Sequence, residues 1–148
     1  MIPDLSFYLG GIRPQNWKRL YDSIVQAMGQ YKFELVICGP YKLPEDLLVY
    51  KNIKYIRDFG SCARSAQIAA INCEAQIITL SADDGVYESG SMAKALEFYN
   101  SFNALNTVIG LRYEEGGNEM YKHDWYWRMK DHDAMKYLPG IPEDTPMS

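Results

Sequence analysis

The sequence lacks the features that would assign it to a membrane or to a nucleic acid. No apolar run approaches the roughly 20 residues that a membrane-spanning helix needs, and residues 1–4 do not begin a signal-like segment. The formal net charge is −4, and the 15 lysine and arginine residues are scattered, so the sequence predicts no positively charged surface that would bind a phosphate backbone. We therefore expect a cytoplasmic protein with no membrane span and no nucleic-acid partner.

Cysteine and histidine are also scarce. Cys38, Cys62 and Cys73 share no Cys-x-x-Cys spacing and lie in or beside apolar segments, which favours reduced packing residues over a metal or redox role. His123 and His132 stand apart in a segment without clear periodicity. They could supply a metal ligand, but such an arrangement is more typical of exposed side chains.

What the sequence does contain is a regular alternation of strand-like and helix-like segments. Apolar runs predict strands at 5–9, 33–38, 53–56, 77–80 and 106–112. Three- and four-residue periodicity, or alanine content, predicts helices at 14–29, 61–71 and 92–99, with a weaker short helix at 43–50. Short connections between strand and helix favour right-handed βαβ units and a mainly parallel sheet. We expect one α/β domain over residues 1–115 and a short segment with an extended tail over 116–148.

The most informative stretch is residues 76–85, where an apolar run ends at two adjacent carboxylates and a glycine. We expect a buried strand that delivers Asp83 and Asp84 to the carboxyl edge of the sheet, where α/β proteins bind ligands. Adjacent ionised carboxylates repel each other, so a cation between them would stabilise the pair. Asp-Gly is also a common turn sequence. The stretch alone leaves turn and binding site open.

Two further motifs, together with the end of this stretch, occur in the order found in one enzyme family. They are Gly-Gly-Ile-Arg-Pro at 10–14, Gly-Ser-Cys-Ala-Arg-Ser at 60–65 and Leu-Ser-Ala-Asp-Asp at 80–84. In this order the chain resembles, over residues 5–111, the nucleotide-sugar-binding half of a family 2 glycosyltransferase, an inverting enzyme. The resemblance implies a Rossmann-like glycosyltransferase A fold, mainly parallel and flanked by helices, in a truncated or minimal form. Two positions depart from the family pattern, with Ser81 at the first carboxylate and Gly39 at the base-reading aspartate.

The resemblance also implies a donor site. It would bind a nucleotide-diphosphate sugar with a divalent cation, manganese or magnesium, held by Asp83 with support from Asp84. Arg64 and Arg13 would lie beside the diphosphate as fixed positive charges. Simple alternatives are a solvated charge at a helix end for Arg64 and a surface charge for Arg13.

The acceptor side is the least defined part of the chain. The resemblance implies that a carboxylate after the fifth strand takes the proton from an unidentified acceptor hydroxyl. Candidates, which the sequence does not rank, are Glu114, Glu115, Asp124, Asp131 and Asp133. Nearby aromatic side chains could face a sugar or anchor the terminal segment, namely Tyr121, Trp125, Tyr126 and Trp127. A second hypothesis is a non-catalytic binding or interaction module, which would permit a homo-oligomer.

Overall fold

The computed structural model describes residues 2–101, 108–109, 114–115 and 118–119. Met1–Asn103 form one compact unit and Ala104–Ser148 a second, and each is described by itself. The division predicted at residues 115 and 116 stays a prediction. Among the described residues, no helix has both the length and the apolar character needed to cross a bilayer.

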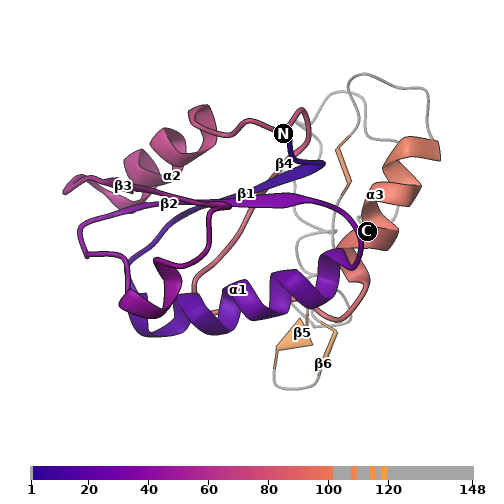
Figure 1. Ribbon diagram of the computed structural model, residues 1–148, viewed down its shortest axis with the longest axis horizontal. Helices are drawn as coiled ribbons and strands as arrows, with labels where there is room; N and C mark the ends of the chain where they lie inside the picture. Colours follow the sequence, from indigo (N-terminus) through magenta and orange to yellow (C-terminus); the bar gives the residue numbers. More distant parts are fainter. Residues whose placement is uncertain (1, 102–107, 110–113, 116–117, 120–148) are drawn as a thin grey trace, which may run out of the picture. The chain divides into compact units, whose positions relative to one another are not determined.

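The first unit is built on a parallel sheet of four strands in the order β3-β2-β1-β4 (Figure 1). Their bounds are Leu5–Gly10 for β1, Phe33–Gly39 for β2, Ile53–Arg57 for β3 and Ile78–Leu80 for β4. Every pairing is parallel, so the carboxyl ends of all four strands lie at one edge. This confirms the α/β class with a parallel sheet flanked by helices.

Three α-helices follow strands, as the periodicity predicts, and span Pro14–Met28 (α1), Cys62–Ile71 (α2) and Ser91–Ser101 (α3). Pro14 suits the first turn of α1, where a missing N–H costs nothing, and Gly29 ends the helix with φ of 56°. Ser61 caps α2 by accepting a hydrogen bond from the backbone N–H of Arg64. The short helix predicted at 43–50 is a single 3-10 turn, Glu45–Leu47.

The strands alternate between two apolar layers, because successive side chains point to opposite faces of a sheet. Leu5, Phe7 and Leu9 of β1 belong to the main core, to which α1 and α3 contribute residues including Trp17 and Met92. On the other face, Val36 and Cys38 of β2 pack with Ala69 of α2. Figure 1 shows α1 and α2 on opposite sides of the sheet. The alanine-rich sequence of α2 suits this close contact.

Two sequence predictions about strands need correction. The prediction that β4 is buried was wrong, since Ile78 is 46% and Leu80 is 60% exposed. In the described sheet, β4 is an outer strand that pairs only with β1. Of the strand predicted at 106–112, only Val108 and Ile109 are described, and neither lies in a strand. Beyond these residues, Glu114–Glu115 (β5) and Asn118–Glu119 (β6) form a short antiparallel pair.

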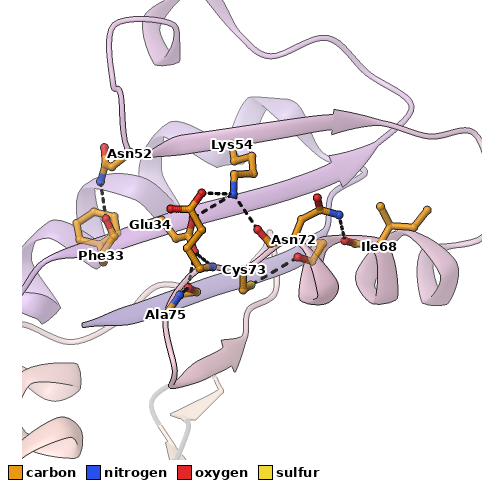
Figure 2. Close-up of polar contacts among 11 residues, drawn as sticks. Phe33, Glu34, Asn52, Lys54, Ile68, Asn72, Cys73 and Ala75 are labelled. Atoms are coloured by element: carbon orange, nitrogen blue, oxygen red, sulfur yellow. Dashed lines mark hydrogen bonds and ion pairs between the residues drawn. The ribbon is translucent and has the colours of Figure 1, made fainter. Parts of the chain in front are cut away.

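A buried carboxylate fixes the chain just before β4 (Figure 2). Glu34, on β2, is only 7% exposed and accepts hydrogen bonds through Oε1 from Ser6 Oγ at 2.5 Å and from the backbone N–H of Glu74. Ser6 Oγ in turn accepts from the backbone N–H of Ala75 at 2.9 Å. Lys54 Nζ lies 3.6 Å from Glu34 Oε2. The loop that leads from α2 into β4 is therefore attached to the two central strands.

Candidate functional site at the carboxyl edge of the sheet

The carboxyl edge brings together the segments that follow β1, β2, β3 and β4. Open α/β sheets bind their ligands at this edge, because the loops there place polar side chains on a rigid scaffold. After β1 comes the loop with Ile12 and Arg13, after β3 comes Asp58, and after β4 come Asp83 and Asp84. The sequence predicted three of these positions.

Asp83 is the most constrained side chain at this edge. It is only 5% exposed, and its Oδ2 accepts the backbone N–H groups of Ile12 at 2.8 Å and of Arg13 at 2.7 Å. Its Oδ1 accepts a hydrogen bond from Nη1 of Arg13 at 2.7 Å. Both oxygens are therefore engaged by the loop between β1 and α1, and charge-assisted bonds of this kind are among the strongest in proteins.

Asp84 shares the same guanidinium. Its Oδ2 lies 2.8 Å from Nη1 of Arg13, although Asp84 is 59% exposed. Arg19 donates from Nη2 to the backbone carbonyl oxygen of Asp84 at 3.2 Å. The cation that the adjacent carboxylates were expected to need is thus supplied by the chain itself. Arg13 thus lies beside Asp83 and Asp84, while its predicted role beside a diphosphate stays a prediction.

Arg64 contacts a different carboxylate. Its Nη2 and Nε lie 3.1 and 3.2 Å from Oδ1 of Asp58, which also accepts the backbone N–H of Gly60 through Oδ2 at 2.9 Å. Sequence reasoning missed Asp58, although it lies two residues after the strand predicted at 53–56, much as Asp83 lies shortly after the strand predicted at 77–80. A shared ligand for Arg13 and Arg64 stays a prediction.

Exposed aromatic rings accompany these charges after β2 and β3. Tyr41 and Phe59 are both more than half exposed, and the guanidinium of Arg57 lies 4.9 Å from the centroid of the Phe59 ring. Such rings offer flat apolar faces to a planar ligand. The signal that could have identified them is again position, since each stands within a few residues of a predicted strand end.

The two departures from the glycosyltransferase pattern have structural reasons. A Cβ atom on Gly39 would lie 2.1 Å from the carbonyl oxygen of Gly11, so no larger side chain fits without a backbone shift. Ser81 is buried, and its hydroxyl shares a 2.7 Å hydrogen bond with the hydroxyl of Tyr87. Burial raises the pKa of Tyr87 above its ordinary value. Both positions therefore contribute to packing.

No protein-family model and no curated protein matches the chain. The relation to family 2 glycosyltransferases therefore stays a resemblance between motifs. The argument for function depends on the residues of the site itself.

The residues of the site do not fit a divalent cation at Asp83 as they stand. A metal needs free carboxylate lone pairs at about 2.0 to 2.6 Å, whereas Oδ2 of Asp83 accepts two hydrogen bonds and Oδ1 accepts one, so Ile12 and Arg13 engage most of its lone pairs. Among the described residues, no group of three or more histidine, cysteine or acidic side chains is placed to hold a metal.

The acceptor-side predictions fall largely beyond the described part of the chain. Glu114 and Glu115 lie in β5, and nothing further is described of their side chains. The other candidates lie outside the described residues, namely Tyr121, His123, Asp124, Trp125, Tyr126, Trp127, Asp131, His132 and Asp133. Their assignment as base, sugar platform or metal ligand stays a prediction.

Proposed function

We propose that this chain binds a nucleotide-diphosphate sugar at the carboxyl edge of its sheet and acts as a glycosyltransferase-like protein. The observation that carries the proposal is the meeting of Arg13 with Asp83 and Asp84 at that edge. Residues from loops some 70 positions apart converge where α/β sheets bind phosphorylated ligands. The motif resemblance supports the same reaction, transfer of the sugar to an acceptor hydroxyl with inversion.

The chemistry requires positive charge beside the leaving diphosphate. The acceptor oxygen would attack the anomeric carbon as the bond to the diphosphate breaks, while a carboxylate, which we do not assign, takes the acceptor proton. Guanidinium groups suit a diphosphate because their N–H fork matches phosphate oxygens. Arg13 and Arg64 both keep part of the guanidinium side chain exposed while Asp83 and Asp58 orient it. Preorganised charge of this kind needs little rearrangement during the reaction.

The test is calorimetric titration with a panel of nucleoside diphosphates, with and without manganese. We expect one nucleotide to bind, and Arg13→Gln and Arg64→Gln each to weaken its binding by roughly tenfold or more, the value of one charge-assisted contact. Lys18→Gln is the matched control, because Lys18 forms an ion pair with Asp22 on the surface of α1. The proposal fails if no nucleotide binds, or if neither arginine substitution changes the affinity for the nucleotide.

A second candidate is a binding module without turnover. It is favoured by Gly39 and Ser81, because packing occupies two positions at which the resembled family carries carboxylates. Under this alternative, a nucleotide-diphosphate sugar would bind, yet neither transfer nor slow hydrolysis of the donor would be detected. Light scattering would then show whether the chain forms a homo-oligomer, the partnership that this alternative permits.

A further inference from the structure

We infer that Arg13 is the built-in cation of the Asp83 and Asp84 pair and that it excludes a divalent metal from this pair. The inference concerns the free protein and does not depend on the proposed function. It rests on the contacts of the two carboxylates, the charge of the surrounding groups and the way in which the backbone holds Arg13.

The first step concerns the position of the guanidinium. Nη1 of Arg13 lies 2.7 Å from Oδ1 of Asp83 and 2.8 Å from Oδ2 of Asp84, so one nitrogen bridges both carboxylates. A metal that bridges these two oxygens would have to lie near the same point, because it must approach each of them within about 2.6 Å.

The second step concerns the other oxygen of Asp83. Oδ2 accepts the backbone N–H groups of Ile12 and Arg13, and Asp83 is almost fully buried. These amides remain whatever side chain stands at position 13, and they fix the backbone from which the guanidinium reaches the carboxylates. A metal would have to displace both the amides and the guanidinium to use Asp83 as a bidentate ligand.

The third step concerns the local charge. Two carboxylates face the Arg13 guanidinium, and Arg19 adds a second positive charge at the carbonyl oxygen of Asp84. Two positive and two negative groups balance formally. The pair therefore presents no residual negative charge to attract a divalent ion, although two adjacent carboxylates in the sequence suggest a site for such an ion.

The experiment titrates the protein with Mn²⁺ alone and follows free Mn²⁺ by electron paramagnetic resonance. We expect wild type to show no Mn²⁺ binding that depends on Asp84. Arg13→Gln, which keeps the backbone donors, should gain one Mn²⁺ site whose affinity is at least roughly tenfold higher than that of wild type for Mn²⁺. The double variant Arg13→Gln with Asp84→Asn should lose the gained site. Lys18→Gln, which removes the positive partner of Asp22, should behave as wild type.

Two results would overturn the inference. One is wild-type binding of a single Mn²⁺ that Asp84→Asn abolishes, a comparison that also serves if Arg13→Gln fails to fold, because Asp84 is largely exposed. The other is a folded Arg13→Gln protein that gains no site, since Arg13 would then not be what excludes the metal. Neither result depends on nucleotide binding, so the proposed function stands or falls separately.

Discussion

Replacing Glu34 should be among the most damaging single changes in the described part of the chain. Glu34→Ala removes the acceptor for the buried Ser6 Oγ and for the part-buried backbone N–H of Glu74. A donor left without its acceptor costs about 1 to 3 kcal/mol. With two donors affected, we expect Glu34→Ala to lower the free energy of unfolding by about 2 to 6 kcal/mol.

Two further variants separate the hydrogen bonds from the charge. Glu34→Gln keeps a carbonyl oxygen that can accept both bonds, so we expect a loss of only about 1 to 2 kcal/mol. Lys54→Met removes the opposite charge, but Lys54 is partly exposed and its Nζ lies 3.6 Å from Oε2 of Glu34. Its loss should stay below about 1 kcal/mol. Hydrogen bonding, more than the ion pair, should account for the role of Glu34.

The assay is urea unfolding followed by far-UV circular dichroism, with hydrogen exchange as a local readout. In Glu34→Ala, the backbone amides of Glu74 and Ala75 should exchange faster, because the carboxylate binds the first directly and positions Ser6 for the second. A loss under about 1 kcal/mol for Glu34→Ala would refute the reasoning. So would equal losses for Glu34→Gln and Glu34→Ala, because the hydrogen bonds would then not matter.

Three other predictions concern cysteine reactivity, backbone packing and alkaline pH. Cys62 is exposed, whereas Cys38 is buried and burial raises the pKa of its thiol. Iodoacetamide should therefore modify Cys62 before Cys38 in the native protein, as followed by mass spectrometry, and faster labelling of Cys38 would contradict its burial. Gly39→Ala should lower the free energy of urea unfolding by about 2 kcal/mol, because its Cβ would lie 2.1 Å from a backbone oxygen, whereas at Gly85 the nearest atom is 3.8 Å away and alanine should cost far less. Burial raises the pKa of Tyr87 above its unfolded value of about 10, so the contribution of its protonated form to stability is complete below that pH and is lost as pH rises through the folded pKa. Thermal midpoints should therefore fall less steeply above about pH 10 in Tyr87→Phe than in wild type. An unchanged slope would exclude Tyr87 as a source of the alkaline loss of stability.

The order of strands and helices could be predicted because apolar residues recur at a different spacing in strands than in helices. Side chains of β1 alternate between two apolar layers, and one face of α1 is buried, so burial leaves a pattern in the local sequence. The exposure of β4 could not be predicted in this way. An apolar run such as the one that ends at Leu80 is compatible with a central or an outer strand, and the position depends on pairing across the sheet.

The site shows the same division between local and distant information. A strand that ends near Asp83 and Asp84 is visible in ten residues of sequence. Their contact with Arg13 is not, because it exists only where β1 and β4 lie side by side. The pairing of Arg64 with Asp58 spans six positions and could have been found by asking which carboxylate lies nearest to that arginine.

The two buried carboxylates of the described residues, Glu34 and Asp83, act on opposite ends of the same strand. β4 has only three residues, too few for its ladder with β1 to fix its position alone. Before β4, Glu34 holds the backbone N–H of Glu74; after β4, Asp83 holds those of Ile12 and Arg13. Glu34 thus ties the segment before β4 to β2, and Asp83 ties the segment after β4 to the loop that follows β1. Because Asp83 also orients the guanidinium of Arg13, the position of β4 decides where positive charge stands at the carboxyl edge. A change at Glu34 should therefore weaken the nucleotide binding proposed for this edge, as calorimetric titration would show, without touching any residue of the site.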